Sequence, residues 1–162
     1  MKPLIALAGK SGAGKTTLAE ALAERYRIPR DNFAAPIRWA LMELGVKAPY
    51  PRQLLQGIGM LLRGWNPDHF IELLAERSGD FPRAGLVIDD LRFLNEYHWL
   101  RQHGFMVVYL EGSFRPLQGA EAEHESETAL SPEVVPFDLV LPAGSSVAER
   151  VEAIASVLDA VD

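Results

Sequence analysis

The sequence predicts an α/β fold in which a doubly wound parallel sheet is covered by helices on both faces. Four short apolar runs have the length and composition of buried strands, at residues 4–8, 86–88, 105–110 and 139–141. Segments with helical spacing of apolar residues separate these runs. Strands that are apolar on both faces are typical of parallel sheets buried between helices. A glycine-rich loop follows the first run, where such a fold turns from strand to helix.

The length of 162 residues fits one domain with a sizeable core. Apolar residues make up 48% of the chain and charged residues 23%, which is usual for a globular protein and excludes a disordered chain. With 16 basic and 22 acidic residues, the net charge of −6 gives no general attraction to nucleic acid or to an anionic membrane. An anionic ligand must therefore be held by a few local side chains.

The absence of cysteine excludes disulfides, thiolate metal sites and a cysteine nucleophile, and it suits a reducing cytoplasm. The apolar run at 4–8 follows Lys2 but is too short for a signal peptide. No stretch approaches the ~18 apolar residues that a spanning helix needs. We therefore expect a cytoplasmic protein with no membrane partner.

Helix signals flank the predicted strands. Apolar residues spaced by four predict a first helix over about 14–27, which Pro29 prevents from continuing. Near the C-terminus, Ser146 and Glu149 form a capping-box pattern before a run of helical periodicity. Residues 32–34 give a weak signal for one more short strand.

Two regions interrupt the alternation of strands and helices. Residues 36–83 contain two or three helical segments rich in leucine and arginine, which is more than one crossover between strands requires. Residues 112–136 are polar, with an acidic run at 121–127. We interpret this second region as a mobile flap.

The glycine-rich loop matches a phosphate-binding pattern. Its sequence, Gly9-x4-Gly14-Lys15-Thr16, lies between a predicted strand and a predicted helix, which is the context that the motif requires. Glycines let successive backbone N–H groups point at phosphate oxygens, and the helix N-terminus adds its positive end. Lys15 can then reach the β and γ oxygens of ATP, and the Thr16 hydroxyl can ligate Mg²⁺. The predicted ATP-binding residues are Gly9, Ser11, Gly12, Ala13, Gly14, Lys15, Thr16 and Thr17.

A pair of carboxylates follows the second strand signal. Asp89 and Asp90 end the run that starts at residue 86, at the edge of the sheet where open α/β folds bind ligands. Either side chain could hold magnesium through water, as a Walker B aspartate does. Asp90 could instead cap the helix expected at 94–103. Thr16, Asp89 and Asp90 are therefore the candidate metal residues.

Arginine outnumbers lysine by 12 to 4 in this acidic chain. Its planar fork matches phosphate oxygens better than the lysine ammonium does. Each arginine taken alone could be a solvated surface group, and local placement favours only Arg92, two residues beyond the carboxylate pair. The candidates for a second phosphate site are Arg38, Arg52, Arg63, Arg92 and Arg115.

Five sequence blocks, in this order, resemble the phage-type deoxynucleoside monophosphate kinases, which belong to the adenylate-kinase-like branch of P-loop kinases. The blocks are Gly9-x4-Gly14-Lys15-Thr16, Phe33-Ala34-x-Pro36-x-Arg38, Arg52-Gln53-Leu54-Leu55-Gln56-x-x-Gly59, Asp89-Asp90-x-Arg92-Phe93-x-Asn95-Glu96 and His124-x-Ser126-Glu127. The resemblance implies one domain over 1–162, with a five-stranded core formed by about 1–35, 84–111 and 133–162. It further implies a nucleoside-monophosphate-binding insertion at about 36–83 and a LID at about 112–132.

The resemblance also implies an activity, the transfer of the ATP γ-phosphoryl group to a deoxynucleoside monophosphate with Mg²⁺. Carried over by position, three arginines grip the acceptor phosphate, Gln56 contacts its sugar or base, and Phe70 borders the base pocket. The acceptor residues are Arg38, Arg52, Gln56, Phe70 and Arg92, and the catalytic residues are Lys15, Arg92 and Arg115. The loop at 142–145 would lie near the adenine of ATP.

A phosphate acceptor is already a nucleophile at neutral pH, so this chemistry needs no general base. We therefore interpret His124, together with Ser126 and Glu127, as contacts that hold the flap closed rather than as a catalytic base.

Three alternatives stay open on the residues alone. One is another small-molecule P-loop kinase, acting on dephospho-coenzyme A, phosphomevalonate or a sugar acid. Another is a P-loop regulatory module, although the chain has no N-K-x-D motif for reading guanine. A nucleic-acid 5′-kinase is disfavoured by the net charge of −6. The expected partners are small nucleotides, and a homodimer is left open.

Overall fold

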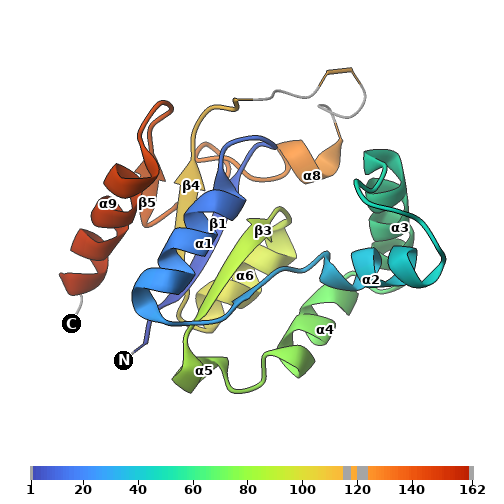
Figure 1. Ribbon diagram of the computed structural model, residues 1–162, viewed down its shortest axis with the longest axis horizontal. Coiled ribbons are helices and arrows are strands. Elements are labelled where there is room, and N and C mark those ends of the chain that lie inside the picture. The colour runs from blue at the N-terminus through green and yellow to red at the C-terminus, as the bar shows by residue number, and fades with distance from the viewer. Residues whose placement is uncertain (1, 115–117, 120–123, 161–162) are drawn as a thin grey trace.

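Five parallel strands form one sheet in the order β2-β3-β1-β4-β5 (Figure 1). The central strand β1 (Leu4–Gly9) pairs with β3 (Leu86–Leu91) and β4 (Met106–Leu110). The short strands β2 (Arg30–Asp31) and β5 (Leu139–Leu141) form the two edges. The predicted doubly wound parallel sheet is therefore confirmed.

Helices connect the strands in this computed structural model, which describes residues 2–114, 118–119 and 124–160. They are α1 (Lys15–Tyr26), α2 (Ala35–Glu43), α3 (Arg52–Trp65), α4 (His69–Arg77), α5 (Phe81–Ala84), α6 (Leu94–Gln102), α8 (Glu125–Thr128) and α9 (Val147–Asp159). None of these helices, within the described ranges, is long and apolar enough to cross a bilayer.

Both faces of the sheet are buried, because alternate side chains of each strand point to opposite sides. Ile5 and Leu7 of β1 pack in a cluster with residues of α1 and α9. Ala6 and Ala8 pack in a second cluster with residues of α4 and α6. The continuous apolar strands that the sequence shows are therefore the consequence of a sheet covered on both faces.

The helix ends follow the local signals. Helix α1 spans Lys15–Tyr26, close to the predicted 14–27, and Arg27 ends it in the left-handed region at φ 52°. In α9 the Ser146 hydroxyl accepts from the Glu149 N–H at 3.2 Å, and the Glu149 carboxylate accepts from the Ser146 N–H at 2.7 Å. This reciprocal pair is the predicted capping box.

The second strand lies at Arg30–Asp31, so the weak strand prediction at 32–34 is wrong. The N–H groups of Phe33 and Ala34 donate instead to the Asp90 carboxylate, at 2.8 and 2.9 Å. These donors are therefore unavailable to a strand ladder, and the chain leaves the sheet to begin α2.

Helices α2, α3, α4 and α5 all lie between β2 and β3 in the chain. Figure 1 shows α2 and α3 projecting away from the sheet, whereas α6 lies against it. The end of α4 is anchored to β2, since the guanidinium of Arg77 donates to the Asp31 carboxylate at 3.2 and 3.3 Å. This insertion forms one wall of the site described next.

Candidate active site

The loop between β1 and α1 has the backbone geometry of a phosphate nest. Gly9 adopts φ 138°, and a Cβ at this position would lie 2.5 Å from the carbonyl oxygen of Leu110 on β4. Gly12 and Gly14 adopt φ 78° and 90°, in the left-handed region that glycine enters without strain. The glycines of the motif are therefore required by the turn itself.

The Lys15 side chain folds back onto the phosphate loop. Its side chain is 7% exposed, and its ammonium donates to the carbonyl oxygens of Gly9 at 2.6 Å and Lys10 at 2.8 Å. The charge is thus held at the nest, where phosphate oxygens of a ligand would arrive.

A cleft of about 690 Å³ opens over this loop. Ser11, Gly12, Gly14, Lys15, Thr16 and Thr17 line it. Two of the predicted ATP-binding residues do not line the cleft. Gly9 lets β1 approach β4, and Ala13 is 1% exposed in the core. The loop therefore presents most of the predicted ATP-binding residues to one cavity.

The two carboxylates at the end of β3 have different surroundings. Asp89 is buried beside the Thr16 hydroxyl, which donates a hydrogen bond to it, and Arg30 Nη1 lies 3.4 Å from its Oδ2. Burial and the neighbouring charge of Asp90 raise the pKa of Asp89. The charge of Arg30 and the hydrogen bond from Thr16 act in the opposite direction. Asp90, with both oxygens accepting backbone N–H groups, anchors the start of α2.

The Thr16 hydroxyl and the Asp89 carboxylate form a pair of hard oxygen donors that fits Mg²⁺, which prefers such ligands and keeps several waters. Asp90 fits this role less well, because its oxygens are already engaged. Within the described ranges there is no group of three or more acidic, histidine or cysteine side chains suited to a metal. The remaining ligands would come from water and from phosphate oxygens.

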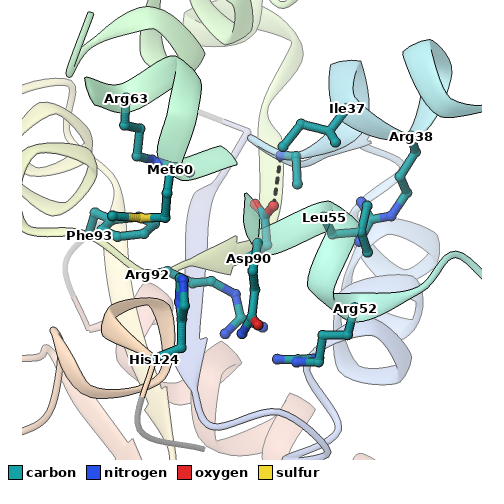
Figure 2. A pocket seen from close by; sticks show the side chains of 12 residues that line it. Ile37, Arg38, Arg52, Leu55, Met60, Arg63, Asp90, Arg92, Phe93 and His124 are labelled. Carbon is teal, nitrogen blue, oxygen red and sulfur yellow. Dashed lines mark hydrogen bonds between the residues drawn. The ribbon is translucent and has the colours of Figure 1, made fainter. Parts of the chain in front are cut away.

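A smaller cavity, of about 110 Å³, adjoins the cleft (Figure 2). Its walls come from α2, α3, the loop between β3 and α6, and His124. Four residues line both cavities, namely Arg38, Arg52, Asp90 and Arg92. Arginines from three separate segments therefore line the junction between the cleft and the second cavity.

Neighbouring groups hold two of these arginines in place. Arg52 Nη1 donates to the Ser11 hydroxyl at 3.1 Å, which joins α3 to the phosphate loop. Arg38 Nη1 donates to the Asn32 amide oxygen at 2.9 Å. Gln56 also lines the smaller cavity, and its buried Nε2 has no hydrogen-bond partner among the described residues. The amide is thus available to a ligand oxygen.

One predicted acceptor residue, Phe70, lines neither of these two cavities. Phe70 is 1% exposed in the core, with the Arg63 guanidinium 4.5 Å above its ring. The expected contact between Phe70 and an acceptor base is therefore corrected to a supporting role behind the cavity wall. Arg115 lies outside the described residues.

Sequence reasoning missed Arg150, which is 3% exposed. Its Nη1 donates to the Ala13 carbonyl at 2.8 Å, and its Nη2 lies 3.4 Å from the Pro142 carbonyl. The guanidinium thus ties the phosphate loop to the loop that precedes α9. The sequence did contain a signal for this residue, because Arg150 is a charged residue beside Val151 and Ile154 on the apolar face of α9.

The start of the predicted flap also rests on the phosphate loop. The Ser113 hydroxyl donates to the Ser11 carbonyl at 2.5 Å, and the Phe114 N–H donates to the Gly12 carbonyl at 2.9 Å. Phe114 lines the cleft as well. No local sequence signal marked these two contacts.

A glycine nest at the carboxyl edge of a five-stranded parallel sheet defines a P-loop nucleotide-binding fold. A comparison with protein-family models finds no match. Among curated proteins, the chain is 27% identical to one of Acanthamoeba polyphaga mimivirus named "Putative deoxynucleotide monophosphate kinase", with 96% of each chain covered.

Among solved structures, the chain is similar to a shikimate kinase from Acinetobacter baumannii in complex with shikimate, with a TM-score of 0.63 and 18% identity. That match covers 99% of this chain and 94% of the other. A gluconokinase from Sinorhizobium meliloti 1021 gives a TM-score of 0.60 at 18% identity, with 99% and 93% covered. The chain therefore has the fold of the P-loop kinases, and the resemblance that its motifs indicate is confirmed over nearly its whole length.

Proposed function

We propose that this protein is an ATP-dependent kinase of (deoxy)nucleoside monophosphates. An oxygen of the acceptor phosphate attacks the γ-phosphorus of ATP, and the bond to the oxygen bridging the β and γ phosphorus atoms breaks. The products are ADP and a nucleoside diphosphate. The observation that carries this proposal is that Arg38, Arg52 and Arg92 line both cavities.

Three guanidinium groups match the charge and geometry of a phosphate monoester. A phosphate monoester is close to a dianion at neutral pH and offers three oxygens. Arginine binds these oxygens through parallel hydrogen bonds. An acceptor phosphate bound there would lie next to the γ-phosphoryl group held by the P-loop. Positioning and charge neutralisation can then supply most of the catalysis.

The P-loop residues would serve the donor. Lys15 would neutralise the β and γ oxygens, and the loop N–H groups would orient them. Mg²⁺, when bound by Thr16 and through water by Asp89, would bridge the same oxygens. We also propose that residues 36–83 bind the acceptor, that residues 112–132 form a LID, and that Arg115 enters from that LID.

A second candidate, a kinase of sugar-acid hydroxyl groups, deserves comparison because the structural neighbours include a gluconokinase and a shikimate kinase. A hydroxyl acceptor gains from a general base. The carboxylate that lines both cavities is Asp90, and both of its oxygens already accept backbone N–H groups. A single substrate carboxylate also requires fewer cations than the three arginines. The name of the mimiviral relative further favours a nucleotide acceptor.

The test is a coupled assay of ADP release with ATP and Mg²⁺. The acceptor panel contains the four deoxynucleoside monophosphates, the ribonucleotides, gluconate, shikimate and dephospho-coenzyme A. Turnover of at least one nucleoside monophosphate, and none by a Lys15→Ala preparation, supports the proposal. Turnover of gluconate or shikimate alone would overturn it in favour of the second candidate.

A further inference from the structure

Glu96, in the first turn of α6, is a buried carboxylate with three donors. Its side chain is 1% exposed. Its Oε2 accepts from the backbone N–H groups of Arg92 at 3.0 Å and Phe93 at 3.1 Å. Its Oε1 accepts from Arg63 Nη2 at 2.9 Å. One carboxylate therefore joins the loop that carries Arg92 to a side chain of α3.

Arg63 reaches this carboxylate through a narrow slot. Its guanidinium carbon lies 4.5 Å from the ring centroid of Phe70 and 4.0 Å from that of Phe93. Gly59 provides the room on α3, since a Cβ there would lie 2.9 Å from Arg63 Nη1 and 3.4 Å from Ile37 Cδ1. The arginine is therefore held by two rings, a helix and a carboxylate, while 16% of its side chain stays exposed.

Asn95, the residue before Glu96, makes a second connection to the insertion. Its Nδ2 donates to the Pro67 carbonyl at 2.8 Å and to Asp68 Oδ1 at 2.9 Å. Pro67 and Asp68 form the turn between α3 and α4. Two adjacent residues at the start of α6 thus contact the corner formed by the end of α3 and the turn into α4: Glu96 contacts Arg63, and Asn95 contacts the turn.

We propose that Asn95 and Glu96 are positioning residues that clamp the corner of α3 and α4 to the loop between β3 and α6, and so fix Arg52 relative to Arg92. The proposal rests on the proposed function, because it assigns these arginines to one acceptor phosphate. Gly59 is the buried residue of helix α3, and Leu55, Ile58 and Leu62 are only partly buried against the core. The clamp therefore adds to a modest set of contacts, which includes the hydrogen bond from Arg52 Nη1 to the Ser11 hydroxyl.

The sharpest test displaces Arg63 without touching Glu96. Gly59→Ala inserts the Cβ that meets Arg63 Nη1, while Gly57→Ala in the same helix meets nothing within 4 Å. Both variants gain similar helix propensity, so helix stability alone predicts the same result for both. Glu96→Gln breaks the charge pair directly. Glu76→Gln is its control, because Glu76 is exposed near the end of α4, away from the corner that Asn95 contacts.

The clamp predicts that Gly59→Ala and Glu96→Gln raise KM for the monophosphate on the order of 10-fold or more, as loss of a supporting contact does elsewhere. KM for ATP should stay within about twofold, since Lys15 keeps its contacts with the loop carbonyl groups in these variants. Gly57→Ala and Glu76→Gln should match the wild type. Backbone amides of α3 should also exchange hydrogen faster in the two clamp variants, whether or not an acceptor is present.

Failure of the clamp and failure of the proposed function give different results. Wild-type protein that phosphorylates no monophosphate overturns the function. Unchanged exchange in α3, or a Glu96→Gln variant that lowers only Tm and leaves KM for the monophosphate at the wild-type value, overturns the clamp.

Discussion

Removing the Lys15 ammonium should affect both catalysis and stability. From the sequence, Lys15→Ala is expected to leave the fold intact and to reduce phosphoryl transfer on the order of 10²-fold or more, since a charge at the phosphates is lost. The structure adds a cost, because the ammonium also holds the carbonyl oxygens of Gly9 and Lys10 together. A hydrogen bond to a charged group contributes about 1.5–3 kcal/mol.

The lower end of that range applies, because the cleft lets water reach the freed carbonyl groups. We therefore expect a loss of about 3 kcal/mol for the two bonds together, which corresponds to a fall in Tm of roughly 6–12 °C for a chain of this size. Thermal unfolding without nucleotide measures the loss of stability, and coupled ADP release measures turnover. Lys47→Ala, at an exposed lysine away from the site, is the control.

The two measurements refute two different parts of the reasoning. A folded Lys15→Ala variant with turnover near that of the wild type would contradict the assignment of the phosphate nest. A variant that is inactive but has an unchanged Tm would contradict the bridging role of the ammonium.

Three further predictions follow from the site. Arg52→Ala and Arg92→Ala should weaken monophosphate binding far more than ATP binding, and equal losses for both ligands in isothermal titration would reject the shared phosphate site. Arg115→Ala should lower kcat sharply with little change in either substrate affinity; normal turnover would remove the arginine from the reaction. Burial raises the pKa of Glu96 from 4.5 to about 7, so the free energy of unfolding should fall as pH rises across this interval. Glu96→Gln should remove that slope in urea titrations at several pH values, and a slope identical to that of the wild type would contradict the assignment.

The parts of the fold that depend on local sequence were predictable. Strands β1, β3 and β4 are apolar on both faces, so their composition alone indicates a covered parallel sheet. The nest needs glycine at fixed positions, so its spacing is visible as a motif. The Ser146 capping box is likewise a contact between residues three apart.

The parts that depend on contacts between distant segments were not predictable. Asp90 was interpreted as a metal ligand or a helix cap, yet it accepts the N–H groups of Phe33 and Ala34, more than 50 positions away. Phe70 carries the same aromatic signal whether it faces a cavity or the core, and only tertiary packing decides between them. Glu96 has a recognisable place in a motif, but its partner Arg63 is on another helix.

Three carboxylates of the core hold the insertion along its length. Asp90 binds its start, Glu96 binds its middle through Arg63, and Asp31 binds its end through Arg77. Two of these anchors consume arginines, so the excess of arginine over lysine is only partly a signature of phosphate binding. The excess also reflects the contacts that hold the insertion. These contacts use planar, permanently charged groups that pair with a carboxylate and stack on aromatic rings. An acceptor site assembled from separate segments requires that rigidity, because arginines that share one phosphate are effective only when the segments that carry them are held in register.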